Sequence, residues 1–270
     1  MTENRQRPIG IFDSGIGGLT VAYAVNQLLP DENLIYFGDT AHFPYGDKSS
    51  AAIQSYTVKI TDVLLKHQCK VILIACNSAS SVAYQLVKEY AGSRAKVMNV
   101  IDPIVTYIGE NYPGENVGLI GTKKTVGSNV YQKKIDKLGK DVILKALATP
   151  LLAPMIEEGY FNNAISYSII QSYLNDKSLE GIKSLILGCT HYPLIKEEIN
   201  QLYHGSVDVI DSSDIVAEYL KEYLIKNNLL NTKSVAEHKF YVSDYTQSFA
   251  ESTRLFFRQE VNLEHYPLWE

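Results

Sequence analysis

Short, uninterrupted apolar runs alternate along this chain with longer segments of helical periodicity. The first three runs are residues 9–12, 34–37 and 71–75, and a polar or glycine-containing segment comes after each. Strands that are apolar on both faces are typical of parallel sheets that are covered by helices. The alternation therefore predicts an α/β fold, in which helices lie on both faces of a parallel sheet.

The same pattern predicts where the other elements lie. Helices are expected at residues 19–29, 49–67, 79–90 and 103–111, and further strands at residues 97–101 and 117–120. Later in the sequence, residues 239–242 predict one more strand and residues 249–257 an amphipathic helix.

Charge and cysteine content exclude several classes of protein. The 270 residues carry 25 Lys and Arg against 30 Asp and Glu, a formal net charge of −5, which argues against a nucleic-acid partner. The apolar run at residues 71–76 is far shorter than the roughly 20 residues of a membrane span, and no secretory signal begins the sequence. Three cysteines, an odd count in a long chain, argue against a disulfide framework. We therefore expect a cytoplasmic protein with reduced thiols.

Two pairs of segments repeat at nearly the same distance. Residues 9–14 match residues 117–122, 108 positions later, and residues 72–77 match residues 185–190, 113 positions later. Buried parallel strands resemble one another, so chance likeness and duplication of two similar halves both explain the strands. In open α/β sheets, ligands bind beyond the carboxyl ends of the strands. If the halves face each other, the residues at these strand ends line one cleft.

Two of the strand ends carry a cysteine. Cys76 follows a buried strand and opens a predicted helix, a position that favours a thiolate, whereas Cys69 has no such context. Cys189 is followed by Thr190 and His191, and the histidine could tune the thiol or carry its proton. The alternatives are buried structural cysteines, a zinc site, which the absence of spaced ligand pairs disfavours, and a Cys–His protease dyad, which leaves Cys76 without a role.

Two further loops contain candidate binding groups. The glycine-rich segment 13–18 fits neither the dinucleotide fingerprint nor a P-loop, but it allows an anion to approach a helix N-terminus. The segment 39–46 ends in Pro-Tyr-Gly, a turn that presents an aromatic hydroxyl and backbone amides. An ordinary strand-to-helix turn would explain the glycines of the first segment but not Asp13. Taken alone, the second segment is typical of an ordinary surface turn.

Together these segments resemble the glutamate racemase family over nearly the whole chain and in the same order. The resemblance lies in residues 11–18, 44–46, 75–80, 121–125, 157–159 and 188–193. It implies two similar parallel-sheet α/β domains that face each other across a central cleft. Residues 1–97 and 209–270 would form the first domain and residues 98–208 the second. One departure is Ser78, where the family more often has threonine.

The resemblance implies a cofactor-independent and metal-free enzyme that interconverts L- and D-glutamate. D-Glutamate would then supply peptidoglycan synthesis, and with it cell-wall biogenesis and cell shape. A homodimer is also implied. Racemisation needs two acid/base groups on opposite faces of the α-carbon, and two thiols can serve in these roles.

Roles for individual residues follow from the same resemblance. It assigns Cys76 to the D-glutamate face, assisted by Asp13, and Cys189 to the L-glutamate face, assisted by His191 and Glu157. Asp39 matches a further acidic residue of the family's site. The implied substrate-binding residues are Asp13, Ser14, Tyr45, Gly46, Asn77, Ser78, Thr122, Thr125, Thr190 and His191.

Other activities remain open at this point. A racemase for aspartate or another amino acid is the nearest alternative. A non-catalytic amino-acid binding protein with the same cleft is a second, and a thiol redox protein is a third, although no C-x-x-C motif is present.

Overall fold

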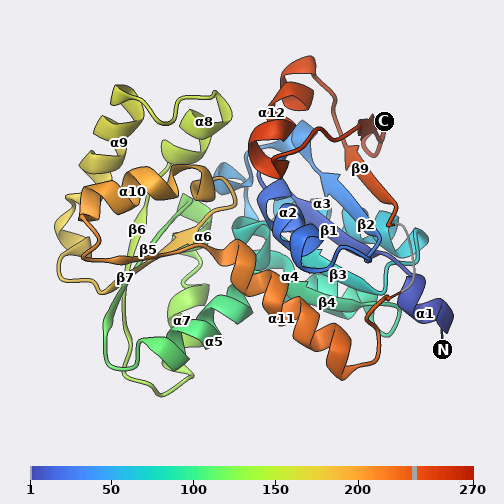
Figure 1. Cartoon of the computed structure of the whole chain (residues 1–270), viewed down its shortest axis with the longest axis horizontal. Coiled ribbons are helices and arrows are strands. Elements are labelled where there is room, and N and C mark those ends of the chain that lie inside the picture. Colours follow the sequence, from blue (N-terminus) through green and yellow to red (C-terminus); the bar gives the residue numbers. More distant parts are fainter. Residues whose placement is uncertain (1, 233–235) are drawn as a thin grey trace.

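Two parallel sheets form the framework of the molecule (Figure 1). The computed structural model describes residues 2–232 and 236–270. The first sheet has the order β10-β9-β2-β1-β3-β4 and the second has the order β6-β5-β7-β8. The strands of the first sheet are β1 (Ile9–Asp13), β2 (Leu34–Gly38), β3 (Val71–Ile74), β4 (Lys96–Asn99), β9 (His238–Val242) and β10 (Leu263–His265). Those of the second are β5 (Asn116–Gly121), β6 (Ile143–Ala148), β7 (Ser184–Gly188) and β8 (Asp208–Ile210).

Helices cover these sheets, so the predicted α/β class with two facing domains is confirmed. Around the first sheet lie α1 (Thr2–Gln6), α2 (Leu19–Leu28), α3 (Ser50–Lys66), α4 (Asn77–Ala91), α11 (Ser212–Lys226) and α12 (Gln247–Phe257). The helix α5 (Ile101–Asn111) contacts both α11 and the helix at Val130–Asp136. Around the second lie α6 (Lys123–Gly127), α7 (Val130–Asp136), α8 (Leu152–Glu157), α9 (Ala164–Leu174) and α10 (Lys196–Tyr203). Within the described residues, no helix is long and apolar enough to cross a membrane.

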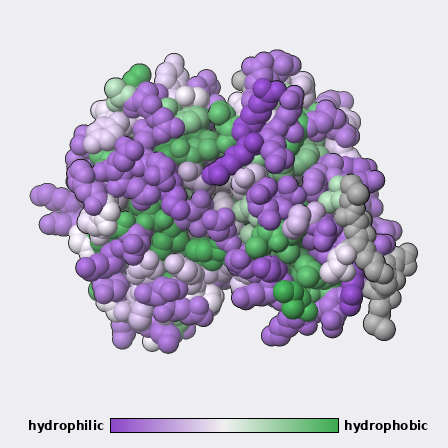
Figure 2. Space-filling view, viewed as in Figure 1, coloured by the Kyte–Doolittle hydropathy of each residue, from purple (hydrophilic) through white to green (hydrophobic). Residues whose placement is uncertain are grey.

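Successive residues of the central strands pack on opposite faces of the first sheet, as a side-chain period of two requires. Ile11 belongs to a core that also contains buried residues of α2 and α11, whereas Phe12 belongs to a core with α3 and α4. All five residues of β1 are buried. This explains why residues 9–12 of the strand form an uninterrupted apolar run, which ends at Asp13. Polar side chains cover most of the face seen in Figure 2, and apolar ones gather there in smaller patches.

The two halves share one topology. β1 lies between β2 and β3, and β5 lies between β6 and β7. β4 and β8 then pair with β3 and β7, respectively. The segments that repeat in the sequence are thus the equivalent strands of the two sheets. This agreement favours duplication over chance likeness. β9 and β10 extend the first sheet beyond β2.

Element boundaries differ from the prediction in a few places. The strand expected at residues 97–101 ends at Asn99, because the Asn99 Oδ1 accepts hydrogen bonds from the N–H groups of Ile101 and Asp102 and starts α5 there. The helix expected at residues 79–90 begins at Asn77. The sequence pattern missed β10, because its three residues include Glu264 and His265 and show no apolar run.

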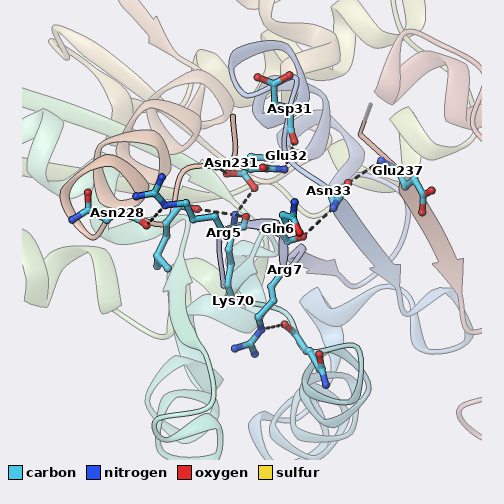
Figure 3. Close-up of polar contacts among 12 residues, drawn as sticks. Arg5, Gln6, Arg7, Asp31, Glu32, Asn33, Lys70, Asn228, Asn231 and Glu237 are labelled. Atoms are coloured by element: carbon cyan, nitrogen blue, oxygen red, sulfur yellow. Dashed lines mark hydrogen bonds and ion pairs between the residues drawn. The ribbon is translucent and has the colours of Figure 1, made fainter. Parts of the chain in front are cut away.

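A buried ion pair between Lys70 and Glu32 lies at the amino end of β3 (Figure 3). The Lys70 Nζ donates to Glu32 Oε2 at 2.5 Å, to the Arg5 carbonyl at 2.5 Å and to the Leu229 carbonyl at 2.9 Å. The Glu32 Oε1 accepts the Asn231 N–H at 2.8 Å. Burial raises the pKa of Glu32 and lowers that of Lys70, since it disfavours both charges. The pair ties α1 and the segment after α11 to the first sheet.

Candidate active site

A small cavity lies where the carboxyl ends of both sheets meet. Its volume is about 30 Å³. The residues around it are Ser14, Phe43, Pro44, Tyr45, Gly46, Cys76, Asn77, Ser78, Thr122, Ala153, Gly188, Cys189, Thr190 and His191. Each half contributes a thiol, because Cys76 follows β3 and Cys189 follows the equivalent strand β7. The structure therefore brings the two cysteine motifs to one site.

Cys76 forms the N-cap of α4. Its Sγ accepts the Ala79 N–H at 3.4 Å, and its S–H donates to Ser14 Oγ at 3.6 Å. Burial, followed by the charge of Asp13, raises the pKa of the Cys76 thiol far above its usual value. Despite its place at a helix N-terminus, Cys76 therefore holds its proton at neutral pH.

Cys189 has a different electrostatic environment. Its Sγ lies 3.8 Å from the His191 Nδ1, and the His191 Nε2 pairs with Glu157 Oε2. Burial disfavours the charge on His191, but the Glu157 carboxylate and Cys189 outweigh it and raise the pKa of the imidazole well above its usual value. A protonated imidazole stabilises negative charge on the Cys189 sulfur. The two thiols thus face one cavity from different electrostatic environments, with the Asp13 carboxyl beside Cys76 and the His191 imidazole beside Cys189.

Asp13 lies behind the cavity wall, beside Cys76. Its Oδ2 accepts the N–H groups of Gly18 at 3.0 Å and Gly15 at 3.3 Å. Burial raises the pKa of Asp13, against the opposing effects of His191 and these N–H groups. The glycine-rich segment predicted to receive an anion thus holds this buried carboxyl with its own amides.

Asp39 also lies outside the cavity, behind Tyr45. The Tyr45 hydroxyl donates to Asp39 Oδ2 at 2.6 Å. The Asp39 Oδ1 accepts from the Ser243 hydroxyl at 2.7 Å and from the Trp269 indole at 2.8 Å. Asp39 is fully buried. The structure therefore places Asp39 as a support for the Pro-Tyr-Gly turn.

Hydroxyl and amide groups connect the two halves across the cavity. The Ser78 and Thr122 hydroxyls lie 2.8 Å apart, and the Tyr131 hydroxyl donates to Asn77 Oδ1 at 2.9 Å. Thr122 is the N-cap of α6, where its Oγ1 accepts the Thr125 N–H at 3.2 Å. Thr125 itself is buried behind Thr122 and does not line the cavity.

Most predicted site residues therefore gather around one cavity, and four of them, Asp13, Asp39, Glu157 and Thr125, lie behind its wall. Phe43 and Ala153 also line the cavity and were not singled out. The Phe43 ring contacts the His191 ring, with 5.6 Å between ring centroids. Phe43 directly precedes the Pro-Tyr-Gly turn, and this position is the sequence feature that could have indicated it as a residue of the site. No group of three or more His, Cys, Asp or Glu in the described part of the chain could hold a metal ion.

Comparison with known proteins settles the family. The family model of Asp/Glu/Hydantoin racemase matches residues 19–220. The chain belongs to this family. It is 41% identical to the glutamate racemase of Neisseria meningitidis over 246 residues, which is 91% of this chain and 90% of the relative.

Solved structures agree with this assignment. The glutamate racemase of Francisella tularensis, crystallised with D-glutamate, superposes with a TM-score of 0.91 and 38% identity over 98% of this chain and 99% of that one. The aspartate racemase of Picrophilus torridus superposes with a TM-score of 0.55 and 18% identity, covering 93% of this chain and 99% of that one. The second likeness shows the fold alone.

Proposed function

We propose that this enzyme is a glutamate racemase, which interconverts L- and D-glutamate by proton transfer between two cysteines and without a cofactor. One observation carries the proposal: Cys76 and Cys189 follow equivalent strands of the two halves and line a single cavity. Similarity to enzymes named for this activity supports the substrate.

The proton moves from one face of the α-carbon to the other. The Cys189 thiolate removes the α-proton of L-glutamate, and the electron pair of the C–H bond stays on a near-planar carbanion. The Cys76 thiol then donates its proton to the opposite face, which yields D-glutamate, a thiolate on Cys76 and a thiol on Cys189. The reverse reaction begins from that second state. In the state that binds L-glutamate, Cys76 carries its proton, in line with the raised pKa of its thiol, and the His191 imidazole, whose pKa is also raised, lies 3.8 Å from the Cys189 sulfur.

The neighbouring charged groups have supporting roles. His191, held by Glu157, stabilises the Cys189 thiolate, and Asp13 controls the charge on Cys76. Asp39 acts through Tyr45.

Amides and hydroxyls meet the anionic substrate. The proposed contacts come from Ser14, Tyr45, Gly46, Asn77, Ser78, Thr122, Thr190 and His191, which line the cavity, with Asp13 and Thr125 behind them. A cavity of about 30 Å³ holds roughly one water molecule. The two halves must therefore separate to admit glutamate.

We further propose a cytoplasmic homodimer whose D-glutamate supplies peptidoglycan synthesis.

Incubation with L-glutamate in D2O tests the proposal. We expect loss of optical activity together with deuterium incorporation at the α-carbon, because the returned proton comes from a thiol that exchanges with solvent. The same assay with L-aspartate should give a much lower rate. Faster turnover of aspartate would favour the alternative substrate, and binding of glutamate without exchange would indicate a non-catalytic protein.

Gly17→Ala is expected to reduce kcat/KM for glutamate by roughly 10- to 100-fold, because small displacements of reacting groups are costly. A Cβ at Gly17 would lie 2.4 Å from the His191 Cε1 and 2.8 Å from the Thr190 Oγ1. The imidazole cannot move aside without leaving Glu157 or Cys189. Steady-state kinetics in both directions measure the effect.

Gly127→Ala is the matched control for this substitution. A Cβ at Gly127 meets no atom within 4 Å, so wild-type kinetics are expected. Unchanged kinetics in Gly17→Ala would show that the close contact between glycine and imidazole is not needed during turnover.

A further inference from the structure

The turn that carries Tyr45 is supported by a segment far away in the sequence. The Trp269 indole N–H donates to the Asp39 Oδ1 at 2.8 Å, and the Tyr45 hydroxyl donates to the Asp39 Oδ2 at 2.6 Å. One buried carboxylate thus connects the indole to a residue of the cavity wall. Tyr45 is 1% exposed, so its ring has little freedom while this link holds.

Aromatic contacts fix the indole in place. The His42 ring stacks on Tyr56, with 3.9 Å between centroids, and meets the Trp269 ring edge-on at 4.5 Å. The Lys59 Nζ lies 4.8 Å from the centroid of the Trp269 ring, a favourable cation–π geometry. The indole therefore reaches Asp39 from a packed cluster rather than from a free chain end.

We propose that Trp269 is a positioning residue for the glutamate site, whose indole N–H, through the Asp39 carboxylate, holds Tyr45 in the wall of the cavity. This inference rests on the proposed function. The indole supplies one of the donors that a fully buried carboxylate needs. Without it, Asp39 retains the Ser243 hydroxyl on the same oxygen and the His42 Nδ1, which lies 3.1 Å from both carboxylate oxygens. The Asp39–Tyr45 unit then has one donor fewer and is held less firmly.

The effect is expected in substrate binding rather than in proton transfer. Tyr45 lines the cavity but carries no proton in the reaction. Its displacement therefore weakens the binding of the substrate and of the transition state by the same amount. Trp269→Phe, which keeps an aromatic ring and removes the N–H, should raise KM for glutamate about tenfold, equivalent to about 1.4 kcal/mol. kcat should stay within about twofold, and the melting temperature should change little.

A double-mutant cycle with Tyr45→Phe tests whether the two residues act together. Trp269→Phe should raise KM in the wild-type background and add nothing in the Tyr45→Phe background, because the link is already broken there. Lys59→Met, which removes the cation over the indole but no hydrogen bond to Asp39, is the control and should retain wild-type KM. Unchanged KM in Trp269→Phe, or independent effects of the two substitutions, would overturn the inference.

The single tryptophan of the chain gives a readout that does not need turnover. Glutamate binding should change the emission of Trp269, and Tyr45→Phe should weaken that response. Wild-type protein that responds in this way but does not racemise glutamate would contradict the proposed function and leave the positioning role supported. A different outcome would contradict the positioning role alone. In that case the wild-type protein racemises glutamate, its Trp269 emission does not change when glutamate binds, and the Trp269→Phe variant has normal KM.

Discussion

Cys189→Ala is expected to lower the rate of glutamate racemisation by about 10³-fold or more in both directions, because an acid/base group that touches the reacting proton contributes 10²- to 10⁴-fold. Alanine cannot take a proton from L-glutamate or return one to that face. In D2O, the variant should also lose deuterium incorporation at the α-carbon of L-glutamate. Polarimetry and NMR on purified protein measure both quantities.

The third cysteine provides the matched control. Cys69 is buried, and burial raises the pKa of its thiol to about 12, so it is an unreactive thiol away from the cavity. Cys69→Ala should therefore racemise glutamate at close to the wild-type rate. Full activity in Cys189→Ala would refute the two-thiol mechanism, whereas a comparable loss in Cys69→Ala would indicate that cysteine replacement acts through the fold.

The sequence allowed the core of the fold and of the site to be predicted because both depend on local patterns. A strand buried on both faces, such as β3, must be apolar throughout, and the residue after it must lie at the carboxyl edge of the sheet. This rule placed Cys76 and Cys189 correctly in relation to their strands. Their meeting in one cavity depends on how the two halves pack, which the sequence suggested only through the repeat.

Properties that arise from contacts between distant segments could not be predicted from such local patterns. The helix N-terminus at Cys76 favours a thiolate in sequence terms, yet burial and Asp13 raise the pKa of that thiol. Asp39 was expected as a member of the site, but its support of Tyr45 depends on Ser243 and Trp269, more than 200 positions away. No periodicity or motif marks a hydrogen bond between such distant segments.

Lys70→Met is expected to lower the free energy of unfolding by about 3–5 kcal/mol, because removal of one partner leaves the other charge buried and unpaired. The side chains of Lys70 and Glu32 are 2% and 1% exposed, respectively. The substitution also removes the donor to the Arg5 and Leu229 carbonyls. The loss is a large share of the stability of an ordinary domain, about 5–15 kcal/mol. Urea denaturation followed by circular dichroism measures it.

Two further variants identify the cause of this loss. Lys66→Met removes an exposed lysine that pairs with Asp62, and the urea midpoint should stay where it is in the wild type, because exposed ion pairs contribute little. Adding Glu32→Gln to Lys70→Met removes the unpaired charge of Glu32, while an oxygen remains to accept the Asn231 N–H. The double variant should therefore recover part of the stability. If it were no more stable than Lys70→Met, the lost carbonyl contacts to α1 and to the segment after α11 would account for the effect, and the charge on Glu32 would not.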